Sequence, residues 1–428
     1  MMSNMDSQLR NALASAGVAT PASPAADSPE LTALGKALFF DKILSGNSNI
    51  SCATCHNPTA GLGDNLPLSI GEGGSGASGA RILASGATTA RNAQHVFNTG
   101  LTGRHVMFWD GRVARDPATG ALRTPEPGLN GPSPALANIA QEIDSALAAQ
   151  ALFPLVSTVE MMGTGNDVAL AGGNAAAWAK IMERLVGSAN GTIGGIAEYR
   201  TLFRAAYPAV TNYDDFNIGH AARAIAAYQR TLSGTNSPLD RFIAGDNSAL
   251  TAQQKRGGMM FFNMAGCGAC HNGPHLTDDR FHVVANPQLL SSGSDDLGRY
   301  SVTLDPNDMY KFKTATLRNV EYNAPYTHSG AYATLEAVVA HYSNPARALD
   351  NYDPTQLRAD YAALVDADPA RKAARLSALD QRLAAPLNLQ SGQIQDIVAF
   401  LRALSDPALA DLSSETPLQS PSGLPVGD

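Results

Sequence analysis

The chain has 428 residues, of which 44% are hydrophobic and 16% are charged. It is therefore long enough to bury a core in two or a few domains, and its composition excludes a disordered protein. The formal net charge is −8 and the isoelectric point is about 5.6, which argues against a nucleic-acid partner. No apolar run approaches the roughly 18 residues that a membrane span requires, so we expect no membrane insertion.

The predicted elements begin with residues 1–30, an N-terminal extension that we expect to be flexible. A first helix is predicted around Leu34–Phe40, where apolar residues recur at helical spacing. Proline and glycine are frequent in Ala114–Pro134, which is predicted to be an exposed loop before a helix over Leu136–Leu152. A closing helix is predicted at Ala224–Leu232, and it should pack back on the first helix.

The second half of the chain repeats this order, which indicates two related domains. The run Arg256–Phe262 matches the first predicted helix, with a glycine four residues before each Phe-Phe pair, and Asp396–Leu404 matches the closing helix. We therefore assign residues 31–233 and 234–406 to an N-terminal and a C-terminal domain. Residues 407–428 form a proline-rich tail that we expect to be extended or disordered.

All cysteines of the chain occur in two Cys-x-x-Cys-His motifs. The motifs are Cys52, Cys55 and His56 in the first domain, and Cys267, Cys270 and His271 in the second. Two thiols one helical turn apart can form thioethers to the vinyl groups of a haem, and the histidine that follows then lies under the iron as an axial ligand.

Zinc binding and thiol redox chemistry fit the motifs less well than haem attachment. A structural zinc site would place both cysteine pairs in one small knuckle, yet they lie in different halves of the chain. A thioredoxin-like redox pair or a disulfide framework would not explain the histidines. The motifs therefore predict a mainly α fold of two cytochrome c-like domains with long irregular loops, each domain with one covalently bound haem c.

Further motifs resemble, in the same order, those of the bacterial dihaem cytochrome c peroxidase and MauG family over about Leu31–Leu404. These motifs are Arg91-Asn92, Phe108–Arg112, Glu160-Met161, Leu317–Val320 and Ala324–Gly330. The resemblance implies a haem in the N-terminal domain that reacts with hydrogen peroxide and a haem in the C-terminal domain that transfers electrons.

The resemblance also implies roles for three side chains. Glu160 matches the family's distal carboxylate, which would take a proton from peroxide and return it to the leaving oxygen. Pro154 matches the proline that limits the space over the iron. Trp109 matches the tryptophan between the two haems, where an indole can carry electrons by hopping. Without the resemblance, Glu160 would be an ordinary loop glutamate and Trp109 a core residue at a domain contact.

A calcium ion between the domains is implied in the same way. Asn92, Asn323 and Pro325 match positions where relatives bind the ion through side-chain and backbone oxygens, which suit a hard cation. The family has threonine where Asn323 stands, although a carbonyl ligand would survive that change.

Two positions depart from the classical peroxidases. Their N-terminal haem is capped by a histidine in a Ser-Ile-Gly-His-Gly run, where this chain has Glu72, so we predict a first haem open to peroxide without prior reduction.

The second departure concerns the C-terminal haem. In the classical peroxidases this haem is ligated by a methionine, where this chain, like MauG, has Tyr342. A thioether favours reduced iron, whereas a phenolate favours oxidised iron. His341 is the rival ligand, although on a helix it would point about 100° away, and Tyr342 could instead be a core tyrosine.

Glu72 and Tyr342 together favour the MauG-like branch. We therefore predict that hydrogen peroxide produces an oxidising state shared by two haems, which oxidises a residue, such as a tryptophan, on a partner protein. One alternative is a cytochrome c peroxidase that takes electrons from a small cytochrome c or cupredoxin, and another is a non-enzymatic dihaem electron carrier. MauG has a tryptophan where this chain has Ala265, so the partner or the route to it should differ. We expect a periplasmic location. Residues 1–17 do not resemble a secretory signal, so we expect that the signal has been removed or replaced.

Overall fold

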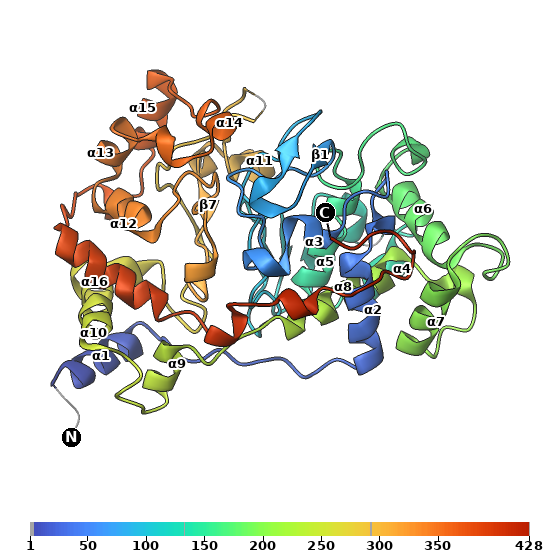
Figure 1. Ribbon diagram of the computed structural model, residues 1–428, viewed down its shortest axis with the longest axis horizontal. Helices are drawn as coiled ribbons and strands as arrows, with labels where there is room; N and C mark the ends of the chain where they lie inside the picture. The colour runs from blue at the N-terminus through green and yellow to red at the C-terminus, as the bar shows by residue number, and fades with distance from the viewer. Residues whose placement is uncertain (1–3, 132, 292, 428) are drawn as a thin grey trace.

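The structure, a computed structural model, describes residues 4–131, 133–291 and 293–427. It is rich in helices, with short antiparallel strand pairs, and Figure 1 shows it as two lobes side by side. The core of the first lobe is drawn from residues 31–232 together with Leu409. The core of the second lobe is drawn from residues 239–404, with three residues from the N-terminal segment.

The first lobe contains α2 (Pro29–Phe40), α3 (Cys52–Cys55), α4 (Ala137–Glu142), α5 (Ala146–Ala151), α6 (Asn174–Val186), α7 (Ala197–Ala206) and α8 (Ile218–Thr231). Its strands are β1 (Gly74–Ser75), β2 (Ile82–Leu83), β3 (Val106–Met107), β4 (Val113–Arg115) and β5 (Leu122–Arg123). β1 pairs with β2, and β3, β4 and β5 form an antiparallel sheet in that order.

The second lobe contains α1 (Asn4–Ser15), α9 (Pro238–Ile243), α10 (Ala252–Met259), α11 (Tyr300–Thr303), α12 (Leu335–Ser343), α13 (Pro345–Asp350), α14 (Ala359–Ala362), α15 (Pro369–Ser377) and α16 (Ser391–Arg402). Its strands β6 (Phe281–His282) and β7 (Phe312–Lys313) pair antiparallel, with Phe281 opposite Lys313. A smaller cluster of apolar residues, including Leu68 and Tyr361, joins the two lobes.

The predicted packing of each closing helix on its first helix is confirmed. α8 lies against α2 and α16 lies against α10, the two most extensive helix contacts among the described residues. A Cβ built on Gly35 would collide with the backbone carbonyl of Ala224, and one on Gly257 would collide with that of Asp396. Because Ala224 and Asp396 also match in the sequence repeat, the same close helix crossing occurs in both lobes.

Gly257→Ala is expected to lower the free energy of unfolding by about 1–3 kcal/mol, because the added methyl group forces α10 away from α16. Thermal unfolding of the haem-loaded protein would measure the change. Gly392→Ala, in the partner helix α16, is the control, since a Cβ there meets no atom within 4 Å. Equal unfolding temperatures for the two variants would contradict the close crossing.

Residues 4–30 of the N-terminal extension are not the flexible segment that we expected, and residues 1–3 lie outside the described residues. In α1, the side chains of Leu9 and Leu13 are buried in the core of the second lobe. Beyond α1, the backbone oxygen of Ala19 accepts a hydrogen bond from Arg318 at 2.8 Å, and Asp27 pairs with Arg230 of α8 at 2.6 Å. The expectation was wrong because the apolar partners of α1 lie more than 200 residues away in the sequence.

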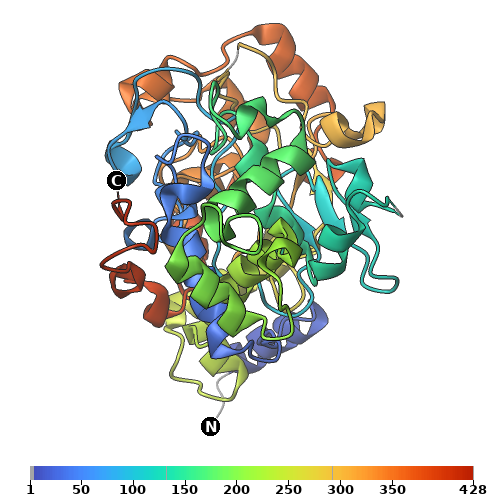
Figure 2. The same cartoon turned by 90° about the vertical axis from the view of Figure 1, so that its right-hand side faces the viewer.

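The C-terminal tail contains two short 3-10 helical segments, Pro407–Leu409 and Ser413–Glu415, and it is bound to the first lobe. Lys36 of α2 pairs with Glu415 at 2.7 Å, and the hydroxyl of Ser422 donates to Asp41 at 2.6 Å. Figure 2, which faces the first lobe, shows the tail in red along the edge of that lobe. The first and last segments of the chain therefore each pack on the lobe formed by the opposite half.

Two predictions for the middle of the chain need correction. The predicted helix over Leu136–Leu152 is two helices, α4 and α5, because the hydroxyl of Ser145 caps α5 by accepting from the backbone N–H of Ala148 at 3.1 Å. The predicted loop Ala114–Pro134 contains part of β4 and all of β5, which pair with Ala114 opposite Arg123.

Candidate functional site

The two Cys-x-x-Cys-His motifs adopt matching local structures. In the first, the backbone N–H of His56 donates to the carbonyl of Cys52 at 2.9 Å, and in the second His271 donates to Cys267 at 2.9 Å. Each motif is therefore one helical turn that presents its histidine after its cysteines.

Each histidine ring is held by the backbone of a leucine farther along the chain. Nδ1 of His56 lies 3.2 Å from the carbonyl oxygen of Leu62, and Nδ1 of His271 lies 3.0 Å from that of Leu276. A carbonyl only accepts, so Nδ1 carries the hydrogen and Nε2 keeps its lone pair for a metal. Both leucines are fully buried and have left-handed backbone, with φ of 57° and 51°, a conformation that costs free energy.

Burial sets the protonation of both motifs. It lowers the pKa of His56 to about 4 and also lowers that of His271, so both imidazoles are neutral at pH 7, as iron ligation requires. Burial raises the pKa of Cys52 and of Cys267 to about 12. A reactive redox pair would have a lowered thiol pKa, so these thiols do not suit that chemistry.

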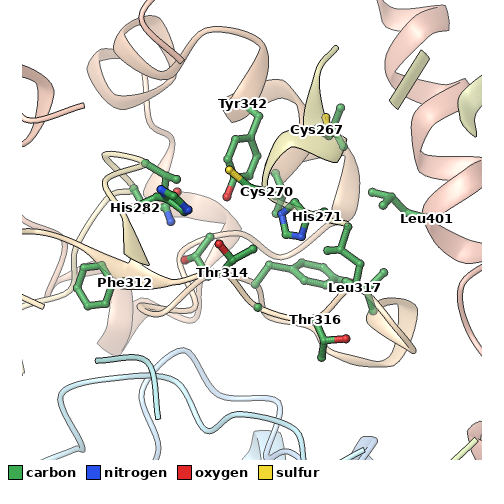
Figure 3. Close-up of a pocket in the computed structure, with 18 of the residues that line it drawn as sticks. Cys267, Cys270, His271, His282, Phe312, Thr314, Thr316, Leu317, Tyr342 and Leu401 are labelled. Carbon is green, nitrogen blue, oxygen red and sulfur yellow. The ribbon is translucent and has the colours of Figure 1, made fainter. Parts of the chain in front are cut away.

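A cavity of about 480 Å³ surrounds the second motif and reaches the first lobe. Figure 3 shows the side chains of Cys267, Cys270, His271 and Tyr342 grouped around it. Most of the remaining lining is apolar and includes Phe261, Leu317 and Val339. The space, its apolar walls and the placement of two thiols and one imidazole fit a covalently bound haem.

Two buried cations face the same cavity. The Arg104 guanidinium lies 3.0 Å from the carboxylate of Asp279, and the Lys313 ammonium lies 3.7 Å from it. Burial lowers the pKa of Lys313 to about 7. Because the Arg104 guanidinium and the Lys313 amine share one carboxylate, and an added anion would favour protonation of Lys313, the cavity suits an anionic ligand. A haem carries two carboxylates that Arg104 and Lys313 can hold.

Of the two rival ligands in α12, only Tyr342 lines this cavity. His341 is completely buried, with Nε2 2.7 Å from the carbonyl oxygen of Val284 and Nδ1 2.9 Å from the Tyr332 hydroxyl. Both nitrogens of His341 therefore have partners outside the cavity. Burial raises the pKa of Tyr342, and the neighbouring Cys270 and Cys267 raise it further, so a cation is needed to make its phenolate.

Trp109 lies where the two lobes meet and also lines the cavity. Its Nε1–H donates to the carbonyl of Asn92 at 2.9 Å, and its own carbonyl accepts from the backbone N–H of Lys313 at 2.7 Å. Its ring packs edge-on against His328, whose imidazole stacks on Phe312 with ring centroids 3.5 Å apart. Trp109 thus contacts the second lobe through both its backbone and its ring.

The three residues predicted to bind calcium all line this cavity. They are Asn92, Asn323 and Pro325. The amide nitrogen of Asn92 donates to the carbonyl of Leu66 at 2.8 Å. The amide oxygen of Asn323 is buried without a hydrogen-bond partner among the residues that the structure describes, and such an oxygen suits a hard cation.

Glu160 and Pro154 lie in the first lobe, outside the cavity around the second motif. The half-buried Glu160 lies in the turn after a short helical segment that Pro154 begins. The loop of Glu72 packs on this turn, since the backbone N–H of Glu72 donates to the carbonyl of Val159 at 3.2 Å and a Cβ on Gly71 would collide with Glu160.

The Glu72 side chain is bound to a different loop. Its carboxylate accepts from the amides of Asn47 at 3.0 Å and Asn49 at 3.2 Å. Glu72 therefore has partners of its own at the position where the classical peroxidases have the capping histidine.

Sequence reasoning missed several residues of the second site. Arg104, Lys313 and His282 belong to no motif that marks them, and only their place in the fold brings them to the cavity. Leu62 and Leu276 had a weak signal, since each follows its haem-motif histidine at a similar distance in the sequence.

Two covalent attachment motifs and a cavity suited to a porphyrin define a protein of the dihaem c class. The sequence matches the family described as di-haem cytochrome c peroxidase over residues 29–248, and the chain belongs to this family. Members of this kind are enzymes, and the chain is accordingly a dihaem peroxidase or oxidase, which disfavours the electron-carrier hypothesis.

The relatives include proteins named as cytochrome c peroxidases and proteins named as MauG. The chain is 34% identical to cytochrome c551 peroxidase of Pseudomonas aeruginosa over 73% of this chain and 71% of the relative. It is 32% identical to methylamine utilization protein MauG of Methylorubrum extorquens over 73% of this chain and 69% of the relative. A solved MauG-like protein associated with microbial copper homeostasis matches with a TM-score of 0.63 and 26% identity, over 92% of this chain and 95% of that one.

Within the residues that the structure describes, none of the helices combines the length and apolar character needed to cross a membrane.

Proposed function

We propose that this chain is a MauG-like dihaem oxidase, which uses hydrogen peroxide to oxidise a residue, such as tryptophan, on a partner protein. The observation that carries the proposal is the placement of Tyr342 in the cavity beside His271, while His341 is bound elsewhere. A phenolate ligand favours oxidised iron and so suits the storage of oxidising equivalents.

The residues that would hold the cofactors follow from the site. Cys52, Cys55 and His56 would hold one haem, and Cys267, Cys270, His271 and Tyr342 the other. Arg104 and Lys313 would bind carboxylates of the second haem, and Asn92, Asn323 and Pro325 would bind calcium at the junction of the lobes. When bound, the two haems would supply the reaction with peroxide and the storage of its oxidising equivalents.

The remaining roles belong to side chains. Glu160 would accept a proton from peroxide and return it to the leaving oxygen, and Pro154 would limit the space available there. Glu72 does not supply an imidazole, and one oxygen of its carboxylate, Oε2, is bound by the amides of Asn47 and Asn49, which supports a first site open to peroxide. Trp109 would carry electrons between the lobes. We propose a periplasmic location, which the resemblance to this family supports.

The alternative is a cytochrome c peroxidase that reduces peroxide with electrons from a small cytochrome c or cupredoxin. The observation in its favour is the 34% identity to a protein named cytochrome c551 peroxidase.

One experiment separates the two functions. The protein, with two haems confirmed by mass, would be mixed with one equivalent of peroxide, and its spectrum followed with and without a reduced small cytochrome c. An oxidase should show an altered spectrum of both haems that persists and is consumed slowly by the cytochrome. Rapid steady turnover with the reduced cytochrome would overturn the oxidase in favour of the peroxidase, and no response to peroxide would contradict both.

A further inference from the structure

A charged cluster that the proposed function does not use lies at the edge of the second cavity. At its centre is His282 of β6, whose Nε2 lies 2.9 Å from a carboxylate oxygen of Asp278 and whose Nδ1 lies 3.0 Å from one of Asp380. The three side chains are only 11–17% exposed. The imidazole is therefore held between two carboxylates and shielded from water.

Arg382 completes the cluster. Its guanidinium binds the carboxylate of Asp380 through two nitrogens, at 2.9 and 2.7 Å, and one nitrogen lies 2.8 Å from Nδ1 of His282. With Nδ1 protonated, Asp380 accepts from both His282 and Arg382, and the approach of Arg382 to Nδ1 joins two donors and is not a hydrogen bond. The carboxylate of Asp278 is the first cause that raises the pKa of His282, followed by the sulfur of Cys270. Because carboxylates flank both ring nitrogens, the protonated imidazole is favoured, and the cluster then holds two positive and two negative charges.

The cluster lies against the attachment point of the second haem. The sulfur of Cys270, a carboxylate oxygen of Asp278 and a ring nitrogen of His282 all lie within 4.8 Å of one another. Figure 3 shows His282 beside Cys270 and Tyr342, on the same side of the cavity. His282, Asp380 and Arg382 line that cavity as well. A porphyrin linked through Cys270 would therefore have these charges at its edge.

We propose that His282 is a positioning residue that keeps a positive charge against the Cys270 edge of the second haem and thereby raises its reduction potential. The inference rests on the proposed function only in taking Cys270 as an attachment point. A cation beside a redox centre disfavours loss of an electron, and the effect is strong where water is excluded. The balance of the cluster then sets how much oxidising power the second site can store.

The test compares variants that remove a positive charge with a variant that removes a negative charge. In the haem-loaded protein, His282→Gln and Arg382→Gln each remove a positive charge and should shift the midpoint potential of the second haem downward. Asp380→Asn removes a negative charge and should shift the potential upward. A spectroelectrochemical titration measures each shift, and Asp396→Asn is the control, because Asp396 also pairs with an arginine of this lobe but does not line the cavity.

Opposite shifts for the histidine and aspartate variants, with none for the control, would support the proposal. A shift caused by lost packing would not change direction with the charge of the residue that was removed. Shifts in the same direction, or none, would overturn it. If His282→Gln does not retain its haem, Arg382→Gln and Asp380→Asn still decide the result, since the Arg382 side chain is 45% exposed. The role of Tyr342 is tested separately by its own variant, so either idea can fail alone.

Discussion

Tyr342→Met is expected to raise the reduction potential of the second haem by on the order of 100 mV, since axial ligands set haem potentials over a range of about 0.8 V. A thioether stabilises reduced iron, whereas a phenolate stabilises oxidised iron. The variant should also shorten the life of the state that peroxide produces, because the second site no longer favours oxidation. Redox titration and the spectrum after one equivalent of peroxide would measure the two effects.

The buried position of Tyr342 makes this substitution informative. Methionine is flexible and apolar, so it can occupy the same cavity without leaving a buried polar group. Tyr332→Phe is the matched control, since it removes a buried phenol from the same region but one that binds His341. An unchanged spectrum and potential in Tyr342→Met would remove Tyr342 from the ligand set and, with it, the main support for the oxidase.

The choice between Tyr342 and His341 also shows how far the sequence could go. The position in the family's pattern and the helical offset favoured Tyr342 over His341 as the ligand. The structure adds a different argument, because both ring nitrogens of His341 have partners, Val284 and Tyr332. Those partners come from distant or unmarked parts of the chain, and no spacing rule relates them to His341.

The same distinction holds for the fold. The helix pairs were predictable because Gly35 and Gly257 recur in matching runs, and the close crossing needs a residue without a side chain at both places. The packing of residues 4–30 was not predictable, because the short α1 is stabilised by tertiary burial of Leu9 and Leu13 and not by local propensity. Lys313 and His282 were missed because their environment, and not their sequence context, makes them unusual.

Glu160→Gln is expected to slow the reaction with peroxide by about 100- to 10,000-fold, the usual contribution of a positioned acid or base. Glutamine keeps the size and polarity of the side chain but cannot transfer the proton at pH 7. Stopped-flow measurement of the spectral change against peroxide concentration would give the second-order rate constant. The resting spectrum should remain that of the unchanged protein, because the substitution leaves both attachment motifs intact.

The environment of Glu160 allows such a rate change to be attributed to the loss of proton transfer. Among the described residues its carboxylate has no hydrogen bond or ion pair, so the substitution removes no such interaction within them. Glu183→Gln is the control, because Glu183 is in the same lobe, pairs with Lys180 and is 47% exposed. A rate constant for Glu160→Gln equal to that of Glu183→Gln would mean that proton transfer to peroxide uses water or another group. The reactivity of the first site would then come only from its open position over the haem. The presence of Glu72 in place of a capping histidine would be enough to explain that open position.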